Sequence, residues 1–184
     1  MNFQRISQLK EIRPLLKEDF NWVGNLHLTK LPTDLATSFG KNYLTRVLYP
    51  LYLEQKISLV IESEGCILLS KGETPNYFYS FLYAATKPKS WGKVFDYLFR
   101  RKTFYNKDLD SMIEVSFIFS NKGYGSKLLI AALENHKDQG IFAYTDTAGD
   151  FYKKHGFSHA GNQRRGGRKL ELWVKNKEIS YSNN

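Results

Sequence analysis

Apolar and polar residues alternate with a period of two in several short stretches of the chain, which is the pattern of β-strands with one buried face. The clearest stretch runs from Ile113 to Phe119. The alternation predicts that one face of this strand carries Ile113, Val115, Phe117 and Phe119. Turn-forming residues separate the other stretches. Strands are predicted there at residues 3–6, 57–62, 66–69, 77–85, 141–145, 157–161 and 170–175.

Apolar residues recur every three or four positions in the remaining stretches, which is typical of helices with one buried face. Gly40 and Pro50 are expected to bend or divide the helical region that follows Pro32. Gly140 is expected to end the helix that follows residue 125. Helices are predicted at residues 8–19, from 32 to about 55, at 91–101, after the glycines at 123 and 125, and around Tyr152.

Gly123 and Gly125 lie between the strand that ends near Phe119 and a helix with a single apolar stripe. Glycines let the backbone turn tightly and let its amides approach a bulky anion. The start of a helix adds oriented N–H groups and the positive end of the helix dipole. The pattern therefore predicts a site for a phosphate or pyrophosphate group, although a loop that only joins strand to helix would show the same glycines. The stripe consists of Leu128, Leu129, Ala132 and Leu133.

A second segment, TDTAGDFYKKHGF at residues 145–157, begins about twenty residues after the glycines. Together the two segments resemble the GCN5-related N-acetyltransferase (GNAT) superfamily over about residues 110–160. In that superfamily a Q/R-x-x-G-x-G/A segment binds the pyrophosphate of acetyl-CoA, and an A-x-x-F-Y-x-x-x-G-F segment supplies a tyrosine near the thioester. The first segment matches only in its glycines, because Ser120 stands in place of Arg or Gln and Phe117 in place of a frequent proline. The second matches at Ala148, Phe151, Tyr152, Gly156 and Phe157.

The resemblance implies an α/β (α+β) fold of the GNAT type, with a mixed, mostly antiparallel central sheet flanked by helices. Two central strands of that sheet splay apart, and acetyl-CoA, the co-substrate, enters between them. The pantetheine arm is then expected along the backbone of Phe117, Ile118 and Phe119. The ammonium groups of Lys122 and Lys127 are expected to add positive charge beside the pyrophosphate, or to serve only solubility. The pyrophosphate is expected on the amides of Lys122, Gly123, Tyr124, Gly125, Ser126 and Lys127.

The reaction that the resemblance implies is direct attack of an amine on a thioester, which needs a proton acceptor and a proton donor. Tyr152 occupies the position of the superfamily's tyrosine and is expected to be the acid, with a packing tyrosine beside Phe151 as the alternative. Glu114 lies on the strand that leads to the cofactor and is expected to be the base, with an ordinary exposed glutamate as the alternative. Asp146, next to Thr145, is a weaker candidate for the base.

The segment from Leu26 to Tyr49 resembles the amino-terminal region of bacterial GNAT proteins associated with surface-polysaccharide synthesis, in which an LP and a later FG precede a helix. This resemblance implies a nucleotide-linked or lipid-linked amino sugar as the acceptor, contacted by His27, Lys30 and Tyr49. An amine of a protein or peptide is the competing acceptor. The competing class without catalysis is a GNAT-like module that binds CoA, or has lost it, and offers a surface to partners.

Composition adds the expectation of one domain. The 184 residues are 42% hydrophobic and 15% aromatic, which suffices for a core and argues against disorder over most of the chain. We expect a single domain over residues 1–179 and a loose tail at 180–184. No signal peptide and no apolar run of about 20 residues is present, so a cytoplasmic protein is expected. Cys66, the single cysteine, is expected to be a buried thiol, and the four histidines form no metal-binding motif, so no metal site is expected.

Lys and Arg number 27 against 18 Asp and Glu, and the resulting net charge of +9 calls for an acidic partner. The candidates are the phosphates of CoA, an anionic small-molecule amine, nucleic acid and membrane surfaces. Residues 91–101 predict a basic, aromatic helix that could lie on an anionic membrane but is more typical of core packing. The basic run NQRRGGRK at residues 162–169 is expected to form an exposed turn. No nucleic-acid-binding motif is present, so no such partner is expected, and the chain is expected to be a monomer or a homodimer.

Overall fold

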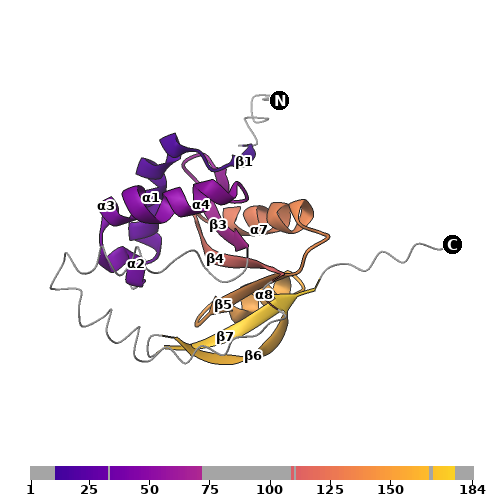
Figure 1. Cartoon of the computed structure of the whole chain (residues 1–184). Coiled ribbons are helices and arrows are strands. Elements are labelled where there is room, and N and C mark those ends of the chain that lie inside the picture. The colour runs from indigo at the N-terminus through magenta and orange to yellow at the C-terminus, as the bar shows by residue number, and fades with distance from the viewer. Residues whose placement is uncertain (1–10, 33, 72–108, 110, 166–167, 177–184) are drawn as a thin grey trace, which may run out of the picture.

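A single sheet forms the centre of the computed structural model, which describes residues 11–32, 34–71, 109, 111–165 and 168–176 (Figure 1). In this part of the chain the sheet has seven strands in the order β1-β2-β3-β4-β5-β7-β6. All neighbours pair antiparallel except β4 and β5, which are parallel, so the expected mixed and mostly antiparallel sheet is confirmed. The strands are β1 (Ile12–Pro14), β2 (Leu59–Ile61), β3 (Gly65–Lys71), β4 (Ile113–Ser120), β5 (Ile141–Thr145), β6 (Ser158–Arg165) and β7 (Arg168–Lys175).

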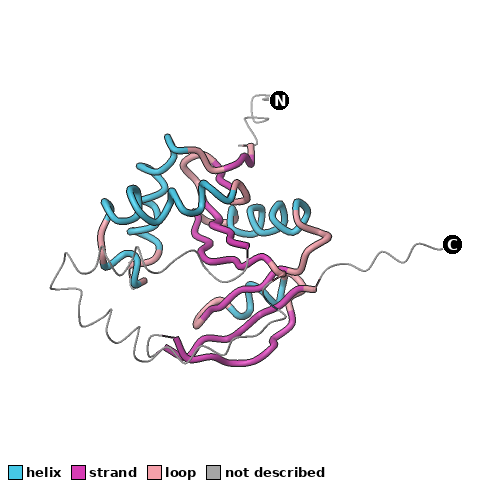
Figure 2. Tube along the Cα trace, in the orientation of Figure 1, coloured by secondary structure: helices cyan, strands magenta, loops and turns pink. Residues whose placement is uncertain are grey.

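Helices cover both faces of this sheet, so the molecule has three layers (Figures 1 and 2). The helices of the amino-terminal third pack on one face. On the other face lie α7 (Tyr124–Asn135) and α8 (Gly149–Lys154). The amino-terminal layer contains η1 (Lys17–Asp19), α1 (Phe20–Lys30), α2 (Leu35–Ser38), α3 (Lys41–Tyr43), the π-helical segment η2 (Leu44–Leu48) and α4 (Tyr49–Gln55).

Strand β3 belongs to both cores, because it is buried on both of its faces. Cys66 and Leu68 point into the core under α1 to α4, whereas Ile67 and Leu69 point into the core under α7 and α8. A strand that is covered on both sides needs a continuous apolar run rather than an alternating one, and residues 66–69 have that composition. The thiol of Cys66 is fully buried, as expected.

Strand β4 contains a β-bulge at Ser116. Leu68 of β3 lies opposite Phe117, but the next residue of β3, Leu69, lies opposite Val115, so Ser116 is the extra residue on β4. The hydroxyl oxygens of Ser116 and Ser70 are 3.1 Å apart, and the hydrogen bond between them ties the bulge to β3. Bulges bend a strand and re-aim its side chains.

The bulge makes one prediction wrong, namely that Ile113, Val115, Phe117 and Phe119 share a face. Ile113 and Val115 lie in the core under α7 and α8. Phe117 and Phe119 lie on the opposite face and pack under α1 to α4. The sequence of one strand keeps its period of two through a bulge, whereas the structure shifts by one residue, so the alternation alone could not show the change of face.

The two parallel central strands splay apart, as the resemblance implies. They pair only at Ile113 with Ile141, Glu114 with Phe142 and Val115 with Ala143. Strand β4 then continues to Ser120 and β5 to Thr145 without further pairing between them. The bulge lies immediately after the last of these pairs, so it marks the point at which the two strands part.

The amino-terminal region differs from its prediction. The structure describes the expected helix at residues 8–19 only from residue 11 onward, and there it shows strand β1 and the short turn η1 instead. Pro14 lacks an N–H, so it fits the outermost strand of the sheet better than a helix interior. Helix α1 was not predicted, because its buried stripe at the spacing i, i+3, i+4, i+7 includes a glycine and a histidine. The stripe consists of Phe20, Val23, Gly24 and His27.

The region after Pro32 is helical, as predicted, and it is divided at Gly40, whose φ of +83° glycine adopts easily. Pro50 does not break the helix, because it lies in the first turn of α4, where no N–H is needed. Helix α7 ends at Asn135, before the expected stop at Gly140. The strands expected at 3–6 and 77–85 and the helix expected at 91–101 lie outside the described residues.

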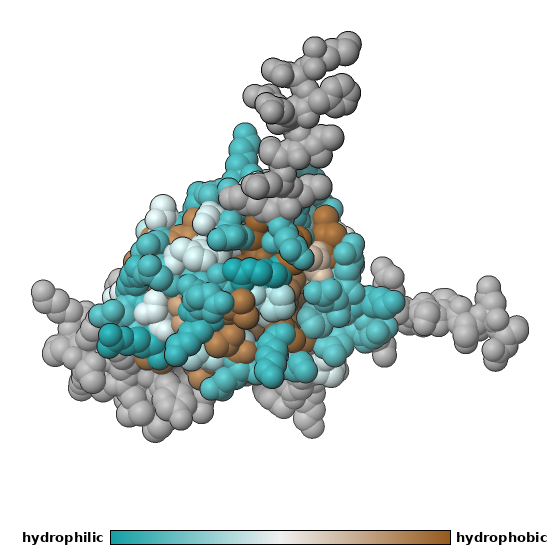
Figure 3. Space-filling view, turned by 90° about the horizontal axis from the view of Figure 1, so that it is seen from above, coloured by the Kyte–Doolittle hydropathy of each residue, from teal (hydrophilic) through white to brown (hydrophobic). Residues whose placement is uncertain are grey.

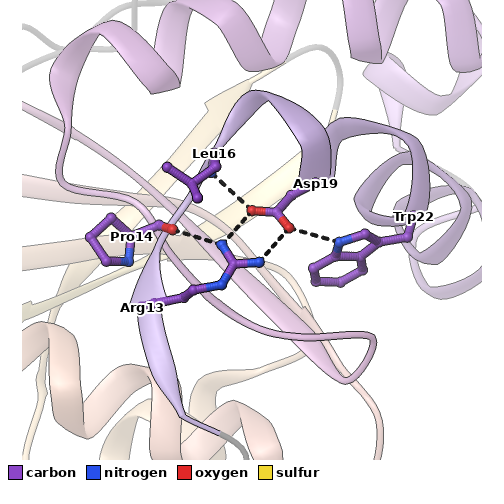
Figure 4. A network of polar contacts seen from close by, with 5 residues as sticks. All are labelled: Arg13, Pro14, Leu16, Asp19 and Trp22. Carbon is purple, nitrogen blue, oxygen red and sulfur yellow. Dashed lines mark hydrogen bonds and ion pairs between the residues drawn. The ribbon is translucent and has the colours of Figure 1, made fainter.

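A buried carboxylate joins β1 to the start of α1 (Figure 4). Asp19, which is 2% exposed, accepts hydrogen bonds of 2.7 Å from the two terminal guanidinium nitrogens of Arg13. It also accepts from the N–H of Leu16 and from the indole N–H of Trp22, each at 2.9 Å. Burial alone would raise the pKa of this carboxyl, but the hydrogen bonds outweigh burial and hold the pKa below its ordinary value. The edge strand is thus attached to the helical layer through one polar cluster.

The face seen from above is mostly hydrophilic, with apolar residues near its centre (Figure 3). Among the described residues the large apolar side chains that stand most exposed are Leu16, at 41%, and Ile130, at 46%. None of the described helices combines the length and the apolar composition that crossing a lipid bilayer demands.

Candidate active site

The first component of the site is the edge of β4 beyond the bulge. One edge of this segment is paired with β3, through Leu68 with Phe117, Ile67 with Ile118 and Cys66 with Phe119. The other edge, which faces the diverging β5, has no strand partner among the residues that the structure describes. Unpaired N–H and C=O groups along a strand edge can bind an extended chain that carries amide groups.

The side chains of this segment are held on the two faces of the sheet and do not extend from its free edge. Phe117 and Phe119 pack beneath the amino-terminal helices, and Ile118 packs toward α7. The three residues expected to present backbone to a pantetheine arm therefore occupy the splayed strand, with their side chains directed away from its free edge.

The second component is the turn from β4 to α7. The N–H of Asn121 donates to the carbonyl of Glu64 at 2.7 Å, and its side-chain amide donates to the Glu64 carboxylate at 2.9 Å. The turn is therefore anchored to the β2–β3 hairpin. Gly123 has a φ of +87°, and a Cβ added there would meet no atom within 4 Å. Glycine is thus required by backbone conformation and not by crowding, and open space lies in front of the turn.

The start of α7 suits an anion. Its first N–H groups have no acceptor within the helix, and that of Tyr124 donates to the carbonyl of Asn121 at 3.2 Å. Its first turn contains no acidic residue. Lys122 and Lys127 are exposed beside it, and the Lys127 ammonium lies 5.3 Å from the centre of the Tyr124 ring. A Cβ added at Gly125 would come within 3.2 Å of the Ser120 hydroxyl oxygen. Ser120 therefore lies against the turn, where the superfamily pattern has a longer side chain.

Tyr152 is the third component. The hydroxyl of Thr145, at the end of β5, accepts hydrogen bonds from the N–H groups of Thr147 and Ala148 and so fixes the entry into α8. This places Tyr152 on α8 with 3% of its surface exposed, its ring about 5 Å from those of Phe151 and Phe157. Burial, and then the nearby charge of Glu114, raise the pKa of the Tyr152 phenol far above its ordinary value. The phenol stays protonated at any physiological pH.

Glu114 is the fourth component, and the structure excludes the alternative of an exposed glutamate because only 4% of its surface is accessible. It lies opposite Ser70 on one side and Phe142 on the other, within the last pairs before the central strands part. Its charge contributes, after burial, to the raised pKa of the Tyr152 phenol. Asp146 is exposed and lies beyond the end of β5.

The three residues expected to contact the acceptor do not share an accessible surface. His27 and Tyr49 are fully buried, and the Nδ1 of His27 lies 3.1 Å from the hydroxyl oxygen of Tyr49. The His27 ring packs against the rings of Phe117 and Phe119, at 5.0 and 4.8 Å between centres, so it supports the splayed part of β4 from behind. Lys30 is exposed at the end of α1. A histidine at an i+7 position of an apolar stripe is the signal that pointed to the core.

No group of three or more His, Cys, Asp or Glu side chains in the described part of the chain is arranged to hold a metal ion. Burial, and then the charge of Asp19, raise the pKa of the Cys66 thiol well above its ordinary value. The thiol therefore stays neutral and unreactive.

The chain matches no protein-family model and no curated protein sequence. It does match solved structures over nearly their whole length. An N-acetyltransferase from Staphylococcus aureus Mu50 is 18% identical with a TM-score of 0.60, over 90% of this chain and 100% of that one. Arabidopsis thaliana Naa50 in complex with the bisubstrate analogue CoA-Ac-MVNAL is 13% identical with a TM-score of 0.53, over 90% and 97%. The GNAT-like decarboxylase GphF in complex with isobutyryl-CoA is 11% identical with a TM-score of 0.56, over 90% and 98%. The chain has a GNAT-like fold.

Proposed function

We propose that this protein is an acetyl-CoA-dependent N-acetyltransferase that acts on a primary amine. The observation that carries the proposal is the continuity of two binding features. The free edge of β4 leads directly into the open turn at Gly123 and the first amides of α7. An extended amide-bearing arm followed by a pyrophosphate is the order of groups in CoA, and two of the matched structures have CoA derivatives bound.

The binding contribution of each part follows from its chemistry. The backbone of Phe117 to Phe119 would pair with the amides of the pantetheine arm, and the splay would admit the arm between β4 and β5. The amides of residues 122–127 would hold the pyrophosphate, with the positive end of the α7 dipole adding attraction. Ser120 is too short to replace the phosphate contact of an Arg, so the exposed ammonium groups of Lys122 and Lys127 supply the charge.

In the proposed reaction the amine nitrogen attacks the carbonyl carbon of the thioester, the new C–N bond forms and the C–S bond breaks. The amine proton passes to a base, and the sulfur leaves as a thiolate that is stabilised by a hydrogen bond or by a proton. Tyr152 is the proposed donor to the sulfur. Because its pKa is far above that of a thiol, which is about 8.5, the phenol acts mainly as a hydrogen-bond donor to the thiolate and not as the source of its proton.

Glu114 is the proposed base. It is an acidic side chain that the fold buries at the point where β4 and β5 part, on the face of Ser70 and away from α7 and α8. A carboxylate in that position can take the proton of an ammonium or amine, directly or through one water molecule. The acceptor would then approach from the face of the sheet opposite to that covered by α8.

The acceptor class follows from charge. A net charge of +9 favours an anionic amine, such as a nucleotide-linked or lipid-linked amino sugar, over a polyamine. A peptide amine is the second candidate, supported by the peptide-bearing bisubstrate analogue bound to one matched structure.

Calorimetric titration with acetyl-CoA, repeated with CoA, tests the proposal. Saturable micromolar binding of both, followed by release of free CoA on addition of amino-sugar nucleotides or of peptides, is the expected result. Absence of binding at millimolar acetyl-CoA would remove the acetyltransferase proposal, and binding without transfer to any amine would leave a CoA-binding module.

A further inference from the structure

A surface cavity of about 640 Å³ lies at the other end of α7 from the glycine turn. Its wall is formed where the carboxyl-terminal ends of α7 and α8 meet the end of β7. Lys137 on this wall is fourteen residues beyond Gly123, and at 1.5 Å per helical residue the separation along the helix is about 20 Å. A ligand in this cavity would therefore not overlap with the site proposed for CoA.

The cavity is rich in positive charge. Lys137 and Lys154 are exposed on its wall, and neither has an ion pair with any residue that the structure describes. The ammonium of Lys175 donates a 3.2 Å hydrogen bond to the carbonyl of His155. Glu134 is the one acidic residue among the lining residues. Two imidazoles, those of His136 and His155, complete the titratable groups of the wall.

The ends of two helices oppose this charge only in part. Each carboxyl-terminal end carries roughly half a negative charge, so the two together offset about one of the three ammonium groups. Several of their carbonyls, most of them at the end of α8, also accept hydrogen bonds from neighbouring donors. The N–H groups of His136 and Gly156 cap α7 and α8, and the Nδ1 of His155 lies 2.7 Å from the carbonyl oxygen of Phe151. Lys137 and Lys154 are therefore not needed as helix caps.

The cavity also has an apolar wall, made by Ile130 and Leu133 of α7. Ile130 is 46% exposed, whereas Leu128, Leu129 and Ala132 of the same helix are buried. The volume falls within the range of about 300–1,000 Å³ found for sites of small organic ligands and exceeds what a free ion needs. Ammonium groups beside an apolar wall match a ligand with one strongly anionic group and one apolar part.

We propose that this cavity is a second ligand site, which binds a small molecule carrying a phosphate group on an apolar body. A phosphate monoester carries nearly two negative charges at neutral pH, so it matches the lysines of the wall better than a single carboxylate does. The apolar body lies against Ile130 and Leu133. The site is independent of the acyl-CoA site, and its test does not require that the protein bind acetyl-CoA.

In the experiment the full chain is titrated with phenyl phosphate and, separately, with inorganic phosphate. Calorimetry and NMR monitor each titration. Both probes are expected to bind saturably with resonance changes at His136 and His155, phenyl phosphate more tightly. Lys154→Glu is expected to lower the affinity for phenyl phosphate about tenfold. The matched control is Lys153→Glu, which is exposed in the same last turn of α8 but does not line the cavity and is expected to change affinity less than about twofold.

Ile130→Ser separates the two parts of the ligand. It is expected to remove the preference for phenyl phosphate over inorganic phosphate, while leaving inorganic phosphate unchanged. Equal losses for the variants at 153 and 154 would overturn the proposal, because they would indicate binding to general surface charge. Displacement of phenyl phosphate by CoA would also overturn it, because the probe would then occupy the glycine turn.

Discussion

The two helical layers cover opposite faces of one sheet, and they differ in what lies beside them, namely aromatic packing under α1 to α4 and the turn at Gly123 before α7. Under α1 to α4 the aromatic side chains close the core, where the Nδ1 of His27 pairs with the Tyr49 hydroxyl and its Nε2 lies 3.7 Å from the Asp34 carboxylate without a hydrogen bond. On the other side the turn into α7 leaves space at Gly123, and the neighbouring edge of β4 is unpaired toward β5. This difference assigns the proposed pyrophosphate site to the layer of α7 and α8 and a packing role to the aromatic side chains under α1 to α4.

Matched glycines give the sharpest way to break this comparison. Gly123 and Gly40 have φ values of +87° and +83°, and a Cβ at either would meet no atom within 4 Å. Valine at either position should therefore destabilise the fold similarly, by about 1–2 kcal/mol. Only Gly123→Val is expected to abolish acetyl-CoA binding, with an affinity loss of at least about 100-fold, because its side chain fills the space before the turn. Calorimetry and thermal unfolding of both variants decide the matter; an equal loss of affinity for Gly40→Val would attribute the effect to the fold.

Tyr152→Phe tests the chemistry proposed for the layer of α7 and α8. The ring and its packing against Phe151 and Phe157 are kept, so stability and acetyl-CoA affinity should stay unchanged. Turnover should fall about 100-fold, since the proposed hydrogen bond to the leaving sulfur is lost. Single-turnover rates with saturating acetyl-CoA measure this effect, and an unchanged rate would assign Tyr152 to packing alone.

Asp19→Asn tests the polar cluster that joins β1 to α1 in the amino-terminal helical layer. The variant keeps the shape of the side chain but loses the charge that binds Arg13, so the free energy of unfolding at pH 7 should fall by about 2 kcal/mol. The pKa of Asp19 is lowered from 3.8 in the folded protein, so this stability is present above about pH 4 and is lost as the pH falls through the folded value. Urea unfolding at pH 7 and pH 3 should show a smaller difference between variant and parent at the lower pH. The exposed neighbour Glu18, changed to Gln, is the control and should matter by less than about 0.5 kcal/mol.

Tyr49→Phe makes the same change as Tyr152→Phe, but in the amino-terminal helical layer. Of the four changes it should have the smallest effect on stability and activity. It removes the partner of the buried His27 Nδ1, so we expect a loss of about 1 kcal/mol in the free energy of unfolding. Turnover per folded molecule should stay unchanged. A loss of turnover as large as that of Tyr152→Phe would mean that the amino-terminal helical layer takes part in the chemistry.

Sequence patterns predicted the parts of the fold that depend on neighbours along the chain. The strand from Ile113, the glycine turn and the helix with Tyr152 are each specified within a few residues of the chain. The bulge at Ser116 was missed because it exists only in the pairing with β3. Helix α1 was missed because Gly24 and His27 stand in its buried stripe, where contacts with Tyr49 and the β4 phenylalanines make them suitable.

The candidate site divides in the same way. Gly123 and Tyr152 could be selected from local motifs, and the structure places both beside the splay. The burial of Glu114 could not be predicted, because it arises from β4 meeting β5 across a long interval of sequence. The cavity at the far end of α7 was invisible for the same reason, since its lysines come from α8, β7 and the residues after α7.

The deep burial of Cys66, the one cysteine of the chain, has a practical consequence for work at the bench. A neutral thiol between two layers of side chains will not react with coloured or fluorescent thiol reagents while the protein is folded. Any free CoA released in an assay can therefore be measured continuously with such reagents, against a blank that contains the protein and the reagent alone. A slow rise of signal in that blank would report how often the sheet opens, and a cysteine introduced on the surface would take up a single label.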